Sequence, residues 1–265
     1  MNVERSLEGR VAIVTGGGRG LGRAMTHGLA HAGATVIATA ARERDEIERV
    51  AADARPAKGR VVPLIADVTN EEDCARIVAT ALDRFGRLDV LVNNAGRGMK
   101  YVSEQFMTEP TRFWETAPAI WRMVIDTNVV GPFLMARAAV PPMLAAGWGR
   151  IINISINAET MRRQGFSPYG PSKAALESAT IIWAQDLAGS GVTVNVLLPG
   201  GAALTGMIPA SCPDHLRAKL LDPAIMVPPL QWLASAKSDG ITGRRFVATR
   251  WREDSPEEAV EAYNF

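Results

Sequence analysis

Tyr169 and Lys173 are the two residues of this chain whose types and spacing are best suited to proton transfer. They lie four positions apart, which places both side chains on one face of a helix. A tyrosine hydroxyl has a pKa of about 10 in water, and a nearby ammonium lowers it by stabilising the phenolate. A proton donor or acceptor works best when its pKa lies near the working pH. The pair therefore predicts proton exchange with an oxygen atom of a substrate.

The residues around Tyr169 favour a helix that begins beside it. Ser167 is suited to the N-cap and Pro168 to the first helical position. Pro171 is tolerated in the first turn, where the N–H groups have no helical partner. We therefore expect Tyr169 and Lys173 near a helix start, at the edge of a ligand crevice.

A glycine-rich turn near the N-terminus predicts a phosphate-binding loop. The run Gly16–Gly22 follows the apolar stretch Val11–Thr15 and precedes a helical pattern. Glycines let the backbone approach a pyrophosphate, and a helix N-terminus offers free N–H groups and a positive dipole end. A nucleoside-triphosphatase loop needs Lys followed by Ser or Thr after the last glycine, whereas Arg23-Ala24 follows here.

Short apolar runs alternate with helical stretches along the whole chain. Continuous apolar strands are typical of a parallel sheet covered on both faces. The alternation predicts one α/β domain over residues 1–265, a doubly wound parallel sheet of the Rossmann type with helices on both faces. The expected strands are Arg10–Thr15, Thr35–Thr39, Val61–Ala66, Asp89–Asn93, Arg150–Ser155, Thr193–Leu198 and Arg245–Ala248, and the expected helices are Leu21–Ala32, Asp45–Ala54, Glu71–Phe85, Ile120–Ala146, Ser172–Ala188 and Gln231–Ser235.

Two stretches, residues 97–119 and 200–229, break this alternation and are rich in proline, methionine and apolar side chains. Both follow strand carboxyl ends, where an open α/β sheet binds its ligands. Long loops in compact domains are usually functional, so we expect substrate-binding lids. The alternative is a pair of ordinary surface loops with local packing.

The ordered motifs resemble the short-chain dehydrogenase/reductase family from about Leu7 to Val247. They are Thr15-Gly16-x-x-x-Gly20-x-Gly22, Asp67-Val68-Thr69, Asn93-Asn94-Ala95-Gly96, Asn128, Tyr169-Gly170-Pro171-Ser172-Lys173 and Pro199-Gly200. The resemblance implies an oxidoreductase that moves a hydride between a nicotinamide cofactor and a carbonyl or secondary alcohol carbon of a partly apolar small molecule.

The resemblance also implies individual roles. Asp67 would contact the adenine, and the segment Asn93–Gly96 would support the cofactor and the central sheet. Lys173 would hold the nicotinamide ribose, and Asn128 would anchor a water that relays protons through it. An asparagine in an apolar helix can instead satisfy a local backbone bend, and this alternative stays open.

The end of the second strand bears on the choice of cofactor. NAD sites usually carry an acid there that grips the ribose 2′-hydroxyl, but no acid precedes Glu43. Arg19 and Arg42 are suited to a 2′-phosphate, so NADP(H) is favoured over NAD(H), unless both arginines are merely solvated beside Glu43 or Asp45. The candidate cofactor-binding residues are Gly16, Gly18, Arg19, Gly20, Leu21, Gly22, Thr39, Arg42, Asp67, Val68, Asn94, Ala95, Gly96, Tyr169, Lys173, Pro199, Gly200 and Thr205.

One position departs from the family pattern. A serine or threonine usually hydrogen-bonds the substrate oxygen beside the tyrosine, but counting back from Tyr169 places Ile156 there. Isoleucine has no donor. Ser155 or Asn157 is the candidate replacement, and weakened chemistry is the third possibility. A rival interpretation of the whole chain is a non-catalytic dinucleotide sensor or scaffold, and another is a different reaction on the same fold.

The composition limits the partners. The 265 residues include 29 basic and 28 acidic side chains, for a net charge of +1, with no basic stripe that predicts nucleic-acid binding. The chain starts with polar residues, and no apolar run is expected to reach membrane-spanning length. The two cysteines lie far apart in the sequence. These features favour a cytoplasmic protein without a membrane partner or a disulfide. His27 and His31 have the i, i+4 spacing of some zinc sites, but no glutamate follows His27, so no metal is expected. The apolar helices 120–146 and 172–188 and the family resemblance favour a homo-oligomer, a tetramer or a dimer.

Overall fold

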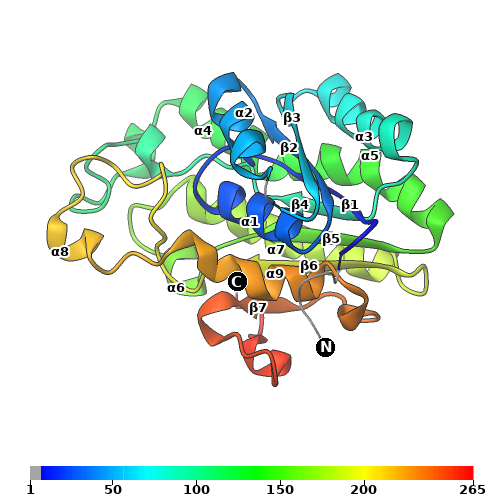
Figure 1. Cartoon of the computed structure of the whole chain (residues 1–265). Helices are drawn as coiled ribbons and strands as arrows, with labels where there is room; N and C mark the ends of the chain where they lie inside the picture. The colour runs from blue at the N-terminus through cyan, green and yellow to red at the C-terminus, as the bar shows by residue number, and fades with distance from the viewer. Residues whose placement is uncertain (1–6, 56, 265) are drawn as a thin grey trace.

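The computed structural model describes residues 7–55 and 57–264. Seven parallel strands form one sheet in the order β3-β2-β1-β4-β5-β6-β7 (Figure 1). They are β1 Val11–Val14, β2 Thr35–Ala40, β3 Arg60–Ile65, β4 Val90–Asn93, β5 Gly149–Ile154, β6 Val192–Leu198 and β7 Arg245–Val247. The strand order changes direction between β1 and β4, and the crevice at that switch point is where open α/β sheets bind ligands. The expected doubly wound fold is confirmed.

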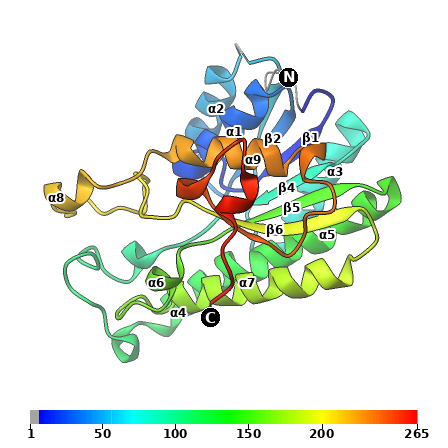
Figure 2. The ribbon, with the colours of Figure 1, turned by 90° about the horizontal axis from the view of Figure 1, so that it is seen from below.

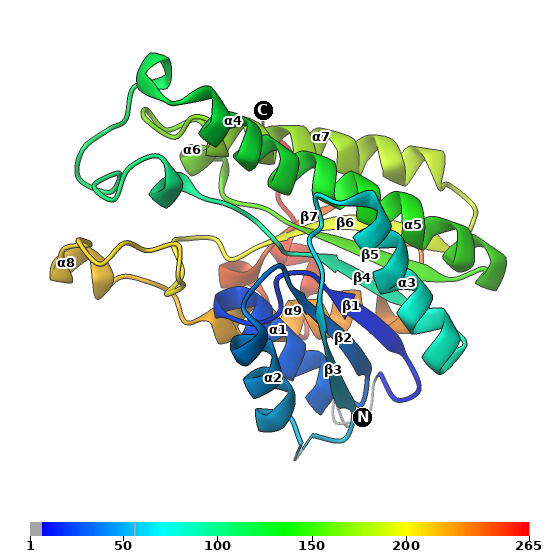
Figure 3. The same ribbon diagram turned by 90° about the horizontal axis from the view of Figure 1, so that it is seen from above.

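Helices cover both faces of this sheet. Figure 3 shows α1, α2 and α9 on one face and α3, α5 and α7 on the other. The helices are α1 Gly20–His31, α2 Arg44–Asp53, α3 Glu71–Phe85, α4 Pro118–Ile125, α5 Gly131–Ala146, α6 Ala158–Met161, α7 Tyr169–Asp186, α8 Asp214–Arg217 and α9 Val227–Leu233. The two cysteines, Cys74 and Cys212, are buried and free.

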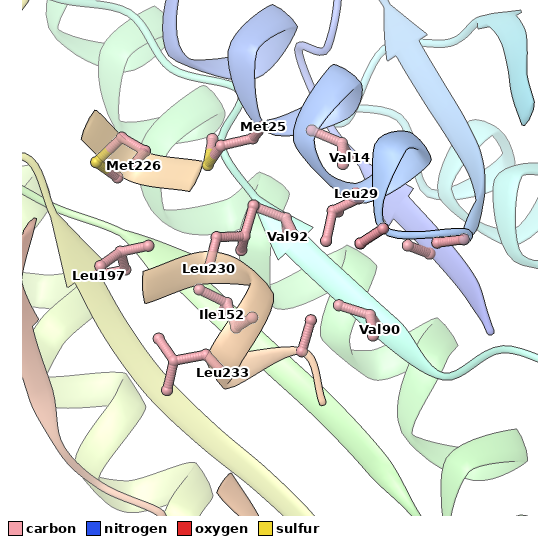
Figure 4. Packing of buried hydrophobic residues seen from close by; sticks show 14 of the residues in the cluster. Val14, Met25, Leu29, Val90, Val92, Ile152, Leu197, Met226, Leu230 and Leu233 are labelled. Carbon is pink, nitrogen blue, oxygen red and sulfur yellow. The ribbon is translucent and has the colours of Figure 1, made fainter. Parts of the chain in front are cut away.

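Alternating side chains of the central strands fill two separate cores. Val92 of β4 faces Met25 and Leu29 of α1 and Leu230 of α9 (Figure 4), whereas Leu91 faces the core beneath α3 and α5. All five side chains are fully buried. Because burial on both faces requires apolar residues at successive positions, the strands appear in the sequence as continuous apolar runs.

One long helical run corrects an expectation about apolar length. α4, a π-helical turn at Asp126–Val130 and α5 follow one another from Pro118 to Ala146. An 18-residue stretch of this run has a mean hydropathy of 1.5 and is one-third buried, so the run is long and apolar enough to cross a membrane by length and composition alone. The buried core helix of a soluble protein meets the same test, and Met135, Ala139 and Met143 of α5 are fully buried against the sheet.

Two helix boundaries differ from the sequence expectations. α7 begins at Tyr169 with Pro168 at the N-cap and no side-chain capping bond, so the assignment of Ser167 to the N-cap was wrong. The physical reason is that the chain already turns before this point, because the Gly170 N–H donates to the Phe166 carbonyl. α9 begins at Val227, inside the stretch expected to be a loop.

The segment after β7 returns along the edge of the sheet. Val260 forms an antiparallel bridge with Phe246 of β7, and the Trp251 ring packs 5.6 Å from the Trp232 ring of α9. Figure 2 shows the chain then running toward α7, and near its end Arg162 donates to the side chain of Asn264. The C-terminal segment therefore connects β7 to the residues just after α6.

Candidate active site

The glycine turn between β1 and α1 has a shape that larger residues cannot adopt. Gly16 has φ of +63°, which L side chains rarely take up. A Cβ on Gly22 would lie 2.0 Å from the Gly16 carbonyl oxygen. The backbone of the turn is therefore packed against the first turn of α1, as a pyrophosphate-binding loop requires.

Asn94 and Ala95, which follow β4, support this turn through hydrogen bonds. The Asn94 side-chain amide donates to the carbonyl oxygens of Thr15 and Gly16, at 2.9 and 3.0 Å. The backbone N–H groups of Asn94 and Ala95 both donate to the Thr15 hydroxyl at 3.0 Å. The segment after β4 thus supports the glycine turn, and its expected role toward the cofactor stays a prediction.

The residues around the turn fit a dinucleotide. The N-terminus of α1 has no side-chain cap and no acidic residue in its first turn, so its positive end is not neutralised by this helix. A Cβ on Gly18 would be in ordinary contact with Glu46 and Ile47, the nearest atom at 3.5 Å, and the buried Thr39 hydroxyl has no hydrogen-bond partner among the described residues. Anionic oxygens and a ribose would supply the missing partners.

The two arginines lie where the adenosine part of the dinucleotide is expected, near the glycine turn and the end of β2. Arg19 is largely exposed, and its guanidinium lies 3.8 Å from the Glu46 carboxylate. Arg42 is exposed just after β2. Asp67 accepts hydrogen bonds from the backbone and hydroxyl of Thr69, at 3.0 and 2.8 Å, and this fixes the turn after β3.

Tyr169 and Lys173 lie on one face at the start of α7, as their spacing predicts. The Lys173 ammonium lies 5.9 Å from the Tyr169 ring centre and donates to the Ile154 carbonyl at 2.8 Å. Burial lowers the pKa of Lys173 to about 8, an effect that the nearby Glu177 carboxylate opposes. Burial raises the pKa of Tyr169 to about 12, so the expected lowering by the ammonium is not seen, because the cost of burying a phenolate dominates.

Asn128 lies in the π-helical turn and uses its whole side chain locally. Its oxygen accepts from the Arg97 N–H at 2.8 Å, and its amide donates to the Arg97 carbonyl and the Ser172 hydroxyl, both at 2.9 Å. Asn128 therefore ties the start of the first loop to α7. These bonds are local and structural, and the proton relay through Asn128 stays a prediction.

The end of β5 separates the two candidates for the missing hydroxyl. The buried Ser155 hydroxyl donates to Glu177 at 2.6 Å, so its proton is directed toward α7. The Asn157 oxygen accepts from the Thr160 N–H at 2.8 Å and caps α6, which leaves its amide N–H groups as donors. Ile156 lies between them.

Glu177 and Arg245 are residues that the sequence analysis missed. Arg245 donates from Nε to both Glu177 oxygens, at 3.1 and 3.0 Å, and from Nη2 to the Ile156 carbonyl at 2.8 Å. The sequence holds only a weak indication of Glu177: it follows Lys173 by four residues, so the acid lies on the same helix face as the lysine.

The two long loops meet above the crevice. Met207 lies against Gly98, and Ser211 donates to the Glu104 carbonyl at 2.5 Å. Closer to the glycine turn, Thr205 lies over Gly20. The segment after β6 therefore contacts both the expected cofactor loop and the expected substrate loop.

The first loop, residues 97–119, also borders a cavity. A cavity of about 580 Å³ lies between residues 111–114 and residues 161–171, and Trp114 and Phe166 are among its lining residues. The Thr111 hydroxyl donates to the Gly165 carbonyl at 2.7 Å across this junction. Trp114 and Met207 thus lie on different parts of the loop assembly.

Residues 10–214 match the family model described as short chain dehydrogenase, and the chain belongs to this family of NAD(P)-dependent oxidoreductases. A 3-oxoacyl-(acyl-carrier-protein) reductase of Synechocystis is 36% identical over 195 residues, 74% of this chain and 75% of that protein. A D-beta-hydroxybutyrate dehydrogenase of Rhizobium meliloti is 35% identical over 211 residues, 79% and 78% of the two chains.

The fold comparison agrees with the sequence comparison. A metagenomic short-chain oxidoreductase solved in complex with NADP is 30% identical, with a TM-score of 0.74 over 89% of this chain and 96% of that chain. The protein is an oxidoreductase that moves a hydride between a nicotinamide cofactor and a carbonyl or alcohol carbon. The comparisons give no support to a non-catalytic sensor or scaffold.

Proposed function

We propose that this protein is an NADP(H)-dependent reductase or dehydrogenase of a partly apolar small carbonyl or secondary alcohol compound. The observation that carries the proposal is the Tyr169–Lys173 pair, which starts α7 with a buried lysine ammonium beside the tyrosine ring. The glycine turn and its supports provide the place for the dinucleotide at the switch point of the sheet.

The cofactor supplies the hydride, and the protein handles the proton. In reduction, Tyr169 donates its hydroxyl proton to the substrate oxygen, and in oxidation it takes that proton back. Burial raises the pKa of Tyr169 and keeps the neutral hydroxyl, the form that donates. Lys173, which gives one of its three donors to Ile154, holds the nicotinamide ribose with the others.

We assign the donor that replaces the missing hydroxyl to Asn157. Its amide N–H groups are available, whereas the Ser155 proton is directed to Glu177. A preorganised donor at a substrate oxygen that gains negative charge stabilises the transition state. Asn157 is held in place because its own oxygen caps α6.

The preference for NADP(H) rests on charge after β2. Arg42 is exposed and Arg19 reaches across the glycine turn, so both can meet a 2′-phosphate. The dissociation constants of NADPH and NADH, compared by protein fluorescence, test this directly. Tighter binding of NADH would overturn the assignment.

The residues of the two loops favour an apolar substrate. Met207 of the second loop and the aromatic residues Phe113 and Trp114 of the first present apolar surface, although the cavity beside Trp114 is also lined by arginines. Turnover of a panel of ketones and secondary alcohols with NADPH or NADP tests the proposed reaction. The panel includes 3-oxoacyl esters and 3-hydroxybutyrate, since relatives are named for such compounds. Cofactor binding without turnover of any compound would count against it.

We further propose a cytoplasmic homo-oligomer, a tetramer or a dimer, without a nucleic-acid or membrane partner. Large apolar side chains are exposed on the outer surfaces of α5 and α7, namely Phe133, Leu144 and Ile182. Figure 3 shows these two helices side by side on the outside of the sheet. Pairing with a second copy through a two-fold axis would bury these side chains.

A further inference from the structure

Five charged residues of alternating sign run from the interior to the surface behind the candidate active site. They are Lys173, Glu177, Arg245, Glu261 and Arg250. Glu177 and Arg245 are each only 1% exposed, and their facing atoms lie 3.0 Å apart. The row begins at the candidate catalytic lysine and ends in the segment that follows β7.

The hydrogen bonds at Glu177 are those of an ionised carboxylate. One oxygen accepts from the Ser155 hydroxyl at 2.6 Å and from Arg245 at 3.1 Å, and the other accepts from Arg245 at 3.0 Å. A buried ion pair of this kind contributes little net stability, because both groups lose their hydration. A role in holding the site explains its place better than a role in stability.

Glu177 and Arg245 both bind residues at the end of β5. Ser155 donates to Glu177, and Arg245 donates to the Ile156 carbonyl. Lys173 donates to the carbonyl of Ile154. Three consecutive residues are thus fixed by this group of charges, directly before Asn157.

The segment after β7 completes the arrangement. The Glu261 carboxylate bonds Arg245, lies 3.2 Å from Arg250, and its backbone N–H donates to the Arg245 carbonyl. Tyr263 packs against the apolar side chains of β6 and β7. Arg245 is therefore held between an inner acid on α7 and an outer acid on the C-terminal segment.

We propose that Glu177 and Arg245 are positioning residues that hold the end of β5, and with it the Ile154 carbonyl to which Lys173 donates, with Glu261 completing the set. This inference rests on the proposed role of Lys173 at the cofactor. The two residues act through Lys173, Ser155 and Ile156 rather than by contact with the substrate.

The electrostatic part of this role has a definite sign. Burial lowers the pKa of Lys173, and the Glu177 charge raises it, so loss of that charge lowers it further. Burial raises the pKa of Glu177, and the Ser155 hydrogen bond and the charges of Arg245 and Lys173 oppose this. Tyr263 of the C-terminal segment is the other titratable group that interacts with Glu177. Burial, followed by the Glu177 charge, raises the pKa of Tyr263, so this phenol stays neutral in the range tested below.

The test is the pH dependence of cofactor affinity, measured between pH 6 and 10 by NADPH fluorescence. We expect affinity to fall as Lys173 loses its proton. In Glu177→Gln, which keeps the shape but removes the charge, the midpoint should move to lower pH by about one unit. Glu177→Asp keeps the charge but shortens the side chain, and its midpoint should stay near that of the unchanged protein.

A second test variant and a control lie in the C-terminal segment. Glu261→Gln should shift the midpoint in the same direction by a smaller amount, and it decides the question if neither Glu177 variant folds. Arg252→Gln changes an exposed arginine of the same C-terminal segment, which pairs with Asp254, and should shift nothing. Thermal unfolding checks that each variant is folded.

The outcomes separate this inference from the proposed function. A folded Glu177→Gln protein with an unshifted midpoint overturns the positioning role alone. A Lys173→Ala protein that keeps both the affinity and the pH profile overturns the role of Lys173 and this inference with it. A shift in Glu177→Gln that is absent in Glu177→Asp supports the proposal.

Discussion

The Lys173 ammonium lies 5.9 Å from the centre of the Tyr169 ring, one helical turn along α7. The lysine gives a hydrogen bond to the Ile154 carbonyl, so its position is fixed by β5 as well as by α7. The two side chains share a face of α7, and the lysine has a hydrogen-bond partner of its own on β5. Their contributions to turnover and to cofactor binding can therefore be measured separately.

Tyr169→Phe should lower kcat by about 10²- to 10⁴-fold, because it removes the proton donor but little volume. NADPH affinity should stay within a few-fold of the unchanged protein. Lys173→Ala should damage both quantities, since the lysine is assigned to the ribose as well. Steady-state kinetics and fluorescence titration provide the two measurements. Near-native turnover in Tyr169→Phe would rule out its proton-transfer role.

Asn157→Ala should lower kcat by about 10²-fold or more, the loss expected for one oxyanion donor. Ser155→Ala should mainly lower the melting temperature, because it leaves the buried Glu177 carboxylate without one of its hydrogen bonds. Turnover and thermal unfolding of both variants distinguish these effects. If neither variant loses more than about tenfold in kcat, which corresponds to about 1.4 kcal/mol, no side chain here is the donor.

Arg42→Ala should raise the dissociation constant of NADPH by about tenfold or more and leave that of NADH nearly unchanged. A hydrogen bond to a charged phosphate is worth about 1.5–3 kcal/mol, and NADH lacks the 2′-phosphate. Arg19→Ala should act in the same direction. Arg84→Ala, on the distant helix α3, is the matched control. Equal losses for both cofactors would show that the arginines do not read the 2′-phosphate.

Phe133→Glu and Ile182→Glu should each split the assembly, because a charge would be forced into an apolar contact between copies. Light scattering at micromolar concentration gives the mass before and after the change. Leu204 is also an exposed apolar residue, but it lies in the loop after β6, so the protein with Leu204→Glu should keep the original mass. A monomeric unchanged protein would refute the proposed oligomer at once.

Met207→Ala and Trp114→Ala should change the ratio of kcat/KM between small and bulky substrates more than they change NADPH affinity. Met207 lies against Gly98 beside the cofactor supports, so its effect should be the larger one. Trp114 lines the cavity beside residues 161–171 and is largely exposed. A change in cofactor affinity alone would place these side chains outside the substrate site.

The strands and the glycine turn could be predicted because their causes are local. An apolar run such as Val90–Val92 must be buried on both faces, and a turn such as Gly16–Gly22 admits few other residues. The pairing of Tyr169 with Lys173 follows from helix periodicity alone. Such features need no knowledge of distant parts of the chain.

The features that the sequence did not reveal depend on distant partners. Ser155 was a candidate for the substrate oxygen, but its direction is set by Glu177, which in turn is held by Arg245, 68 residues further along. The start of α7 was misplaced because the preceding turn, closed by Phe166 and Gly170, outweighs the capping preference of Ser167. The Glu177–Arg245 contact has no spacing that a single sequence displays, whereas the Phe166–Gly170 turn is local and competes with the capping preference of Ser167.

The contact of Thr205 with Gly20 has a consequence for the order of events in catalysis. The same segment reaches the substrate loop at Met207 and Ser211. A dinucleotide seated in the glycine turn would occupy space beside Thr205 and so set the position of the whole segment. We therefore expect a compulsory order, in which the dinucleotide enters first and leaves last, and the substrate meets a completed binding surface only in between.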